Sequence, residues 1–510
     1  MSFERASGVL LHPSSFPGPY GIGDIGPQAF EWVSFLAASE TRLWQVLPLG
    51  PTGYGDSPYQ CFSAFAGNPY LISPQALLAD DLLHPNDLVD APQFPDDKVD
   101  FGAIIPFKLG VLDRAYQRYK QAKKGRLQQA FADFRQAEAH WLPDFAIFMA
   151  IKEAFGGGPW IDWPAELRQR QPQALDKFIR ENQVAIERHT FRQFVFFRQW
   201  QRLRHHAHAQ GVQIIGDIPI FVAHDSADVW ANPELFYLDH DGNPTVVAGV
   251  PPDYFSPTGQ LWGNPLYRWD VHAQNGYQWW ISRFRAVLSM VDIVRLDHFR
   301  GFAGYWEIPG DAKTAQEGEW VPGPGAAFLE AVEAELGELP IIAEDLGVIT
   351  PDVVELRERF HLPGMKVLVF AFDDDASNPF LPHNYNPDCV VYTGTHDNDT
   401  VLGWYQRVAE KERDFARRYL ARNGQDISWD MIRTAWSSVG VIAVTPLQDL
   451  LSLDNTARMN YPSTLGGNWI WRMTTGSLTE PLRARLAAMN RLYGRSAQPT
   501  VRATTQDGTS

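Results

Sequence analysis

The chain has 510 residues, 45% of them hydrophobic, and a formal net charge of −16 from 44 basic and 60 acidic residues. This acidic balance argues against nucleic acid or an anionic membrane as a partner, because phosphate binding needs a basic surface. It places no limit on neutral ligands such as sugars, and an aromatic share of 13% suits a binding cleft in which sugar faces stack on rings.

Eight short apolar runs, each ending in polar or glycine-rich sequence, predict buried strands. Helical patterns lie between most of them, at 27–39, 275–289, 325–337, 351–360 and 408–422. Strands that alternate with helices indicate parallel β-α-β units, and eight such units predict a (β/α)₈ TIM barrel of class α/β. A doubly wound sheet is the alternative. The predicted strands are 8–12, 43–48, 212–217, 291–297, 339–345, 365–372, 389–397 and 440–446.

Large insertions interrupt this pattern. Residues 66–209 read as a mainly helical insertion, and residues 224–274, rich in proline, glycine and aromatics, read as a loop cap. We therefore expect a single catalytic barrel over 1–495 with helical and loop insertions between strands. The last residues, 496–510, have little to bury and are expected to be disordered.

The cysteines and the start of the chain bear on the compartment. Cys61 and Cys389 are too few and too far apart for a disulfide framework or a metal cluster. The sequence has neither a signal-peptide pattern at its start nor an apolar stretch of about 18 residues. We expect a cytoplasmic protein without a cysteine-bound metal.

Acidic and histidine side chains follow several predicted strands, where a barrel carries its catalytic groups. Carboxylates that meet there without a metal-ligand motif favour glycoside chemistry, which needs one ionised carboxylate and one carboxylic acid. A neighbouring negative charge raises the pKa of the carboxylic acid. On a strand, an arginine two residues from the other carboxylate lies on the same face and keeps that carboxylate ionised. The strand-end groups are Asp217, Arg295, Asp297, His298, Glu344, Asp345, His396, Asp397 and Asp399.

The stretches "VRLDHFRGF", "IIAEDLG" and "YTGTHDNDT" resemble the catalytic segments of the 4-α-glucanotransferases, called amylomaltases or disproportionating enzymes. These belong to glycoside hydrolase family 77 in the α-amylase clan. The resemblance covers residues 7 to 473 in order, including "GYGDSPYQ", "GVPPDYFSPTGQLWGNPLY" and "NYPSTLGGNWIWR". It implies a barrel, a retaining mechanism, no cofactor, and α-1,4-glucans, maltooligosaccharides and glucose as donors and acceptors.

The resemblance also implies individual roles. Asp297 would be the nucleophile, Glu344 the acid/base and Asp397 the acid that stabilises the transition state. Substrate-binding residues implied in the same way are Ser57, Tyr59, Asp217, Tyr254, Phe255, Gln260, Trp262, Arg295, His298, Asp373, His396 and Asn468. We expect a monomer or a weak oligomer.

Simpler interpretations remain for several motifs. Asp297 alone could be a structural ion-pair partner of Arg295 or Arg300, and His298 with His396 could belong to a metal site. The "GIGDIG" segment at 21–26 fits a dinucleotide fingerprint only weakly, because a proline-rich loop separates it from its strand. At the level of function, an α-1,4-glucan hydrolase with the same three carboxylates and an inactive glucan-binding protein are the alternatives.

Overall fold

The computed structural model describes residues 3–123, 125–252 and 256–496. Tyr254 and Phe255, which we expect to bind substrate, lie outside the described residues, as does the segment 497–510 of the predicted disordered tail.

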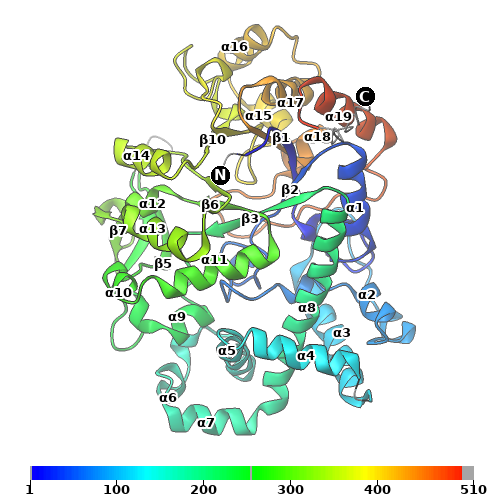
Figure 1. The fold of residues 1–510 in the computed structure, drawn as a ribbon, viewed down its shortest axis with the longest axis vertical. Coiled ribbons are helices and arrows are strands. Elements are labelled where there is room, and N and C mark those ends of the chain that lie inside the picture. The colour runs from blue at the N-terminus through cyan, green and yellow to red at the C-terminus, as the bar shows by residue number, and fades with distance from the viewer. Residues whose placement is uncertain (1–2, 124, 253–255, 497–510) are drawn as a thin grey trace, which may run out of the picture.

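An eight-stranded parallel sheet forms the centre of the molecule, and every strand predicted from the sequence is present (Figure 1). Its order is β10-β11-β12-β1-β2-β3-β6-β9, and the Ala343 amide donates to the Pro363 carbonyl at 2.9 Å between the two ends of the sheet. The sheet is thus a nearly closed barrel, which confirms the predicted fold. The strands are β1 Ala6–Leu10, β2 Leu43–Gln45, β3 Gln213–Pro219, β6 Ile293–Asp297, β9 Ile341–Ala343, β10 Gly364–Val367, β11 Cys389–Tyr392 and β12 Ile442–Pro446.

Helices cover the barrel and build the insertion. The segment 368–388, between β10 and β11, has only two 3₁₀ turns and no α-helix. The α-helices of the insertion are α2 Pro74–Ala79, α3 Phe101–Gln121, α4 Arg126–Ala137, α5 Leu142–Ala154, α6 Ala165–Arg168, α7 Pro172–Glu181 and α8 Gln183–Ala209. The others are α1 Pro27–Ala38, α9 Ala227–Ala231, α10 Trp269–Gln274, α11 Gln278–Met290, α12 Arg300–Ala303, α13 Gly325–Leu336, α14 Pro351–Arg359, α15 Val401–Arg407, α16 Glu410–Leu420, α17 Ile427–Ser437, α18 Leu447–Leu450 and α19 Glu480–Leu492.

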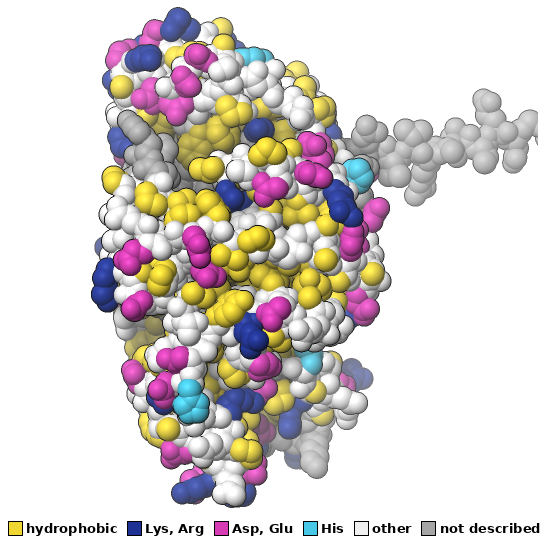
Figure 2. All heavy atoms as spheres, turned by 90° about the vertical axis from the view of Figure 1, so that its left-hand side faces the viewer, with side chains coloured by type: hydrophobic (Ala, Val, Ile, Leu, Met, Phe, Trp, Pro, Cys, Tyr) yellow, Lys and Arg dark blue, Asp and Glu magenta, His cyan; other side chains and the backbone are white. Residues whose placement is uncertain are grey.

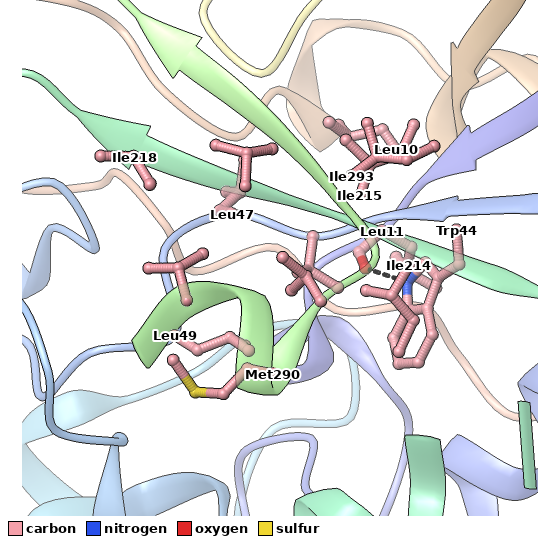
Figure 3. Packing of buried hydrophobic residues seen from close by; sticks show 14 of the residues in the cluster. Leu10, Leu11, Trp44, Leu47, Leu49, Ile214, Ile215, Ile218, Met290 and Ile293 are labelled. Carbon is pink, nitrogen blue, oxygen red and sulfur yellow. Dashed lines mark hydrogen bonds between the residues drawn. The ribbon is translucent and has the colours of Figure 1, made fainter. Parts of the chain in front are cut away.

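The barrel core is packed with aliphatic side chains from adjacent strands (Figure 3). Leu10, Ile215 and Ile293 are almost wholly buried. Trp44 is also buried, and its indole N–H donates to the Leu11 carbonyl at 2.7 Å, which satisfies its one polar atom. These apolar strands form the core, and the polar residues that can carry out chemistry follow their ends.

The end of the helical insertion belongs to the barrel wall. Trp200, on α8, packs against Trp44 of β2 with ring centroids 5.9 Å apart. Its indole N–H donates to the Met290 carbonyl at the end of α11, at 2.9 Å. The last part of α8 therefore serves as the helix that connects β2 to β3, so the barrel resumes before residue 209.

A second, antiparallel sheet includes part of the segment 224–274, which we predicted to be only a loop cap. Its order is β5-β4-β7-β8, with β4 Val246–Val250, β5 Gln260–Pro265, β7 Gly304–Pro309 and β8 Glu319–Pro322. Two of its strands come from the cap and two from the chain after β6. The strands are short and rich in glycine and proline, so their alternation is too weak to stand out in sequence.

The surface carries charges of both signs. On the face shown in Figure 2, lysine and arginine side chains are interspersed with aspartate and glutamate, and hydrophobic side chains spread across the middle. Within the described residues, the helices are all too short or too polar to cross a bilayer.

Candidate active site

A cleft of about 570 Å³ opens at the carboxyl ends of the barrel strands. Its walls are the turn 54–60, the strand β5 with residue 259 before it, and the segment 460–469, which follows β12 and α18. Side chains from the ends of β6 and β11 form its floor. The predicted site residues that line it are Ser57, Tyr59, Gln260, Trp262, Asp297, His298, His396, Asp397 and Asn468.

Arg295 lies just below the cleft, between two carboxylates. The parallel register of β3 and β6 places Asp217 beside Arg295. The Arg295 Nη1 lies 2.7 and 2.8 Å from the two Asp217 oxygens and 2.8 Å from Asp297 Oδ1. Burial alone would lower the pKa of Arg295, but the two carboxylates outweigh it and raise this pKa well above its usual value. The expectation that Arg295 and Asp297 point the same way is confirmed.

Glu344 stands next to Asp297 because of strand register. Leu296 of β6 pairs with Ala343 of β9, so the next residues on each strand, Asp297 and Glu344, reach the rim at the same level. The Glu344 carboxyl accepts hydrogen bonds from the His298 amide at 2.7 Å and the Leu346 amide at 2.8 Å. Glu344 is only 8% exposed. Both turns that follow the strands therefore hold its carboxyl in place.

The surroundings of Glu344 raise its pKa toward neutral pH. Burial raises its pKa most, and the charge of Asp297 raises it further. Arg295 and the two amide hydrogen bonds oppose this shift, and the resulting pKa is about 7. A carboxyl group with such a pKa can both give and take a proton near neutral pH, which general acid–base catalysis requires.

His298 turns the chain between the two carboxyl groups. Its φ of 53° lies in the left-handed region, which a residue with a side chain enters at a cost of about 1–3 kcal/mol. This turn lets its amide reach Glu344 while its ring faces the cleft and meets the Trp262 ring edge-on at 4.8 Å. Its Nε2 is buried and has no partner among the described residues. Trp262 in turn donates to Gln260 Oε1 at 3.1 Å.

Tyr59 forms a flat surface where the turn 54–60 meets the cleft floor. Its hydroxyl donates to Asp217 Oδ2 at 2.7 Å, and its ring stacks on His396 with centroids 5.0 Å apart and planes 16° apart. Trp469 leans against the same ring at 5.7 Å. Burial and the nearby Asp217 raise the pKa of Tyr59 well above its usual value, so the hydroxyl stays protonated. Asp217 has no exposed side-chain surface and thus supports Arg295 and Tyr59 from below.

Asp397 and His396 form an ion pair at the other side of the floor. His396 Nε2 lies 3.3 Å from Asp397 Oδ1, which also accepts a hydrogen bond from Asn460 Nδ2 at 2.7 Å. Burial alone would raise the pKa of Asp397, but His396 and the Asn460 hydrogen bond outweigh it and lower this pKa to about 2. The Asp397 side chain is 44% exposed, so an ionised carboxylate faces the cleft.

A buried carboxylate fastens both ends of the turn that carries this pair. Asp449 Oδ2 accepts from the Thr393 hydroxyl and Oδ1 from the Val401 amide, each at 2.7 Å. Asp449 is fully buried, and burial raises its pKa to about 6. The turn 393–400 is thus closed at its base, between Thr393 and the first residue of α15, although it contains no regular secondary structure.

Two predicted residues lie in other surroundings. Asp373 is exposed, does not line the cleft and accepts a hydrogen bond from Asn378 at 2.8 Å. Asn468 lines the cleft, but its carboxamide binds its own loop, accepting from the Tyr461 amide at 2.9 Å and donating to the Thr464 carbonyl at 3.2 Å. In this structure, Asn468 shapes the cleft wall.

The residues that support Asp397 and Tyr59 are not among those predicted from the sequence. Asn460 and Trp469 both fall in the stretch "NYPSTLGGNWIWR", in which the family resemblance points only to Asn468. Arg458 precedes that stretch, and Asp449 lies in the helix that follows the last strand. A search for polar residues at every strand end, extended through the segment after β12, would have found Asp449.

Several simpler interpretations now have a structural account. Arg300 donates to the Val348 carbonyl and lies 3.8 Å over the Trp320 ring, so it is not the partner of Asp297. Asp399 pairs with Arg407 and Arg458. In the glycine-rich segment 21–26, Asp24 forms a buried ion pair with Lys108 at 3.1 Å. Among the described residues, no group of three or more His, Cys, Asp or Glu side chains is placed to hold a metal ion.

Comparison with known proteins agrees with this geometry. A family model described as 4-alpha-glucanotransferase, glycoside hydrolase family 77, matches residues 11–479. The chain is 52% identical to the 4-alpha-glucanotransferase of Thermus thermophilus, over 96% of this chain and 99% of the relative, and 50% identical to that of Synechocystis, over 96% and 98%. An amylomaltase from Streptococcus agalactiae, solved with acarbose, superimposes with a TM-score of 0.94 at 40% identity, over 97% of this chain and 100% of that one. The chain therefore belongs to the 4-alpha-glucanotransferase family, glycoside hydrolase family 77.

Proposed function

We propose that this enzyme cuts an α-1,4-glucan and transfers the released segment to the 4-hydroxyl of glucose or of another glucan, with retention at the anomeric carbon. One observation carries the proposal. Asp297, paired with a guanidinium, stands beside Glu344, a buried carboxyl with a pKa of about 7. Retaining glycosidases need such a pair, one group ionised and the other able to give up a proton.

In the first step, Glu344 gives its proton to the glycosidic oxygen while Asp297 attacks the anomeric carbon. The bond from that carbon to oxygen breaks, a bond to the Asp297 carboxylate forms, and the freed sugar leaves with a new 4-hydroxyl. The ion pair with Arg295 fixes the direction of the Asp297 carboxylate. Asp397, ionised and facing the cleft, stabilises the positive charge that develops on the sugar ring.

In the second step, Glu344 acts as the base. It takes the proton from the 4-hydroxyl of the acceptor, whose oxygen attacks the anomeric carbon and displaces Asp297. The two inversions give net retention. Tyr59, stacked on His396 and tied to Asp217, supplies a fixed ring on which the sugar at the point of cleavage rests.

For transfer to prevail over hydrolysis, the acceptor sugar must react with the covalent intermediate faster than water does. Holding an acceptor in place can lower the activation barrier for transfer by on the order of 7–11 kcal/mol. Trp262, braced by Gln260 and packed edge-on against His298, is a rigid aromatic wall directly above the acid/base turn. We assign acceptor positioning to this wall, together with Tyr254 and Phe255.

We also propose the partners and the compartment. The substrates are α-1,4-glucans, maltooligosaccharides and glucose, and we expect a monomer or weak oligomer in the cytoplasm. Burial raises the pKa of Cys61 to about 12 and that of Cys389 to about 11, so both thiols stay protonated.

The experiment that separates transfer from hydrolysis uses maltotriose alone. Transfer yields glucose and a ladder of longer oligosaccharides, with almost no gain in reducing ends. A hydrolase with the same carboxylates yields only shorter products, and reducing ends rise in proportion to consumption. An inactive glucan-binding protein leaves maltotriose unchanged.

A further inference from the structure

Two segments that are far apart in the chain are joined beside Asp397. The Asn460 amide donates to the His396 carbonyl at 3.2 Å, while its side chain donates to Asp397 Oδ1 at 2.7 Å. Asn460 therefore holds the backbone of one residue of the ion pair and the carboxylate of the other. This is the point at which the segment 460–469 begins to form the cleft wall.

Arg458 fixes the same junction from behind. Its guanidinium donates to the Asp397 carbonyl, to the Asp399 carboxylate and, at 2.7 Å, to the Asn460 carbonyl. It also lies 4.1 Å over the Tyr461 ring. Its side chain is only 13% exposed. One buried cation thus connects the turn that carries Asp397 to the segment that carries Asn460.

The hydrogen bonds leave Asp397 with one oxygen for substrate. Oδ1 is shared by Asn460 and His396, whereas Oδ2 accepts no hydrogen bond from the part of the chain that the structure describes. A carboxylate fixed by one oxygen presents the other in a single direction, and preorganisation of this kind is what lets a charged group act on a transition state.

We propose that Asn460 is a positioning residue that sets the orientation of Asp397, and that Arg458 braces Asn460 in turn. This inference rests on the proposed function, in which Asp397 stabilises the transition state. Asn460 acts through Asp397, so its loss lowers kcat and leaves KM nearly unchanged. Misplacing a reacting group by about 1 Å costs roughly 10²-fold, so we expect Asn460→Ala to lower kcat by about 10- to 100-fold.

The decisive measurement is a double-mutant cycle in the full-length enzyme, with maltotriose as substrate. In the wild-type background, Asn460→Ala gives the expected loss of kcat. In the Asp397→Asn background, the same change gives almost no further loss, because the carboxylate that it orients has gone. Equal losses in both backgrounds would show a general structural role and overturn the proposal.

Two further variants sharpen the cycle. Asn460→Asp keeps the shape of the side chain but replaces the donor with a second carboxylate beside Asp397, so it must be at least as damaging as Asn460→Ala. Thr456→Ala, an exposed residue two positions before Arg458, is the matched control and keeps wild-type kcat. Full activity of Asn460→Asp would contradict the proposal. Melting temperatures of all variants identify any that fail to fold.

The cycle also keeps this inference apart from the proposed function. If Asp397→Asn retains near-normal activity, the role given to Asp397 is wrong and the proposed function must be revised. If Asp397→Asn loses activity while Asn460→Ala does not, the proposed function stands and the positioning role of Asn460 is rejected.

Discussion

The floor and the walls of the cleft are built in different ways. Just beneath the floor, Arg295 and Glu344 are 4% and 8% exposed and are fixed by buried charge pairs or backbone amides. On the walls, Tyr54 and Leu465 are 72% and 75% exposed. Strand ends give the precision that bond cleavage needs, whereas loops give a surface that selects what enters. Loss of a floor residue should therefore abolish chemistry, and loss of a wall residue should redirect it.

The largest effect is expected at the two central carboxyl groups. Glu344→Gln removes the proton donor and Asp297→Asn the nucleophile, so each should lower kcat with maltotriose by roughly 10²–10⁴-fold or more. The rates are measured by glucose release, with melting temperatures as the control for folding. Near-normal activity in either variant would disprove the role assigned to that residue.

Removal of the buried cation should damage both activity and stability. Arg295→Met leaves Asp217 and Asp297 without their shared partner, and breaking a buried pair from one side costs about 3–5 kcal/mol of unfolding free energy. Denaturant unfolding gives the value. In the Asp217→Asn background the cost should be smaller, because one uncompensated charge is absent. An unchanged stability would show that this cluster does not hold the floor together.

The pH dependence of kcat/KM should follow the titration of Glu344. Its pKa is raised to about 7, so the protonated form needed for bond cleavage is lost as pH rises through that value. We expect kcat/KM to fall about tenfold per pH unit above it. Asp397, with a pKa of about 2, stays ionised throughout. With α-maltotriosyl fluoride, fluoride leaves without an acid, so the rate of the first step should not fall above pH 7. If the rate falls with this substrate as well, the decrease belongs to a group other than Glu344.

The smallest effect on rate is expected at the wall. Trp262→Ala leaves the carboxyl groups in place, so donor cleavage should change only severalfold while water gains access to the intermediate. The ratio of transfer to hydrolysis should fall, measured as reducing ends gained per maltotriose consumed. An unchanged ratio would exclude Trp262 as the cause of transfer.

The floor could be predicted from sequence because it follows regular structure. The run ending in Arg295 and Asp297 is a strand, and side chains two apart on a strand share a face, so their pairing followed from spacing. The roles of Asp297, Glu344 and Asp397 did not follow from spacing and were supplied by the family resemblance. The burial of Asp217 beneath the floor depends on neighbours from other strands, which spacing alone does not reveal.

The walls and supports were harder to predict because they depend on contacts between distant loops. Asn460 reaches Asp397 across 63 positions of the chain, and Asp449 reaches Thr393 across 56. The antiparallel sheet was missed because its strands come from two separate segments, 246–265 and 304–322. No local pattern brings such segments together.

The central claim is that Asp297 becomes covalently bonded to the sugar while Glu344 handles the proton. Its most direct test uses Glu344→Gln with α-maltotriosyl fluoride, because fluoride leaves without acid help and the missing base slows the second step. Acid quenching and peptide mass spectrometry should then find a maltotriosyl ester on Asp297. An ester on another residue, or fluoride release with no ester at all, would contradict the account.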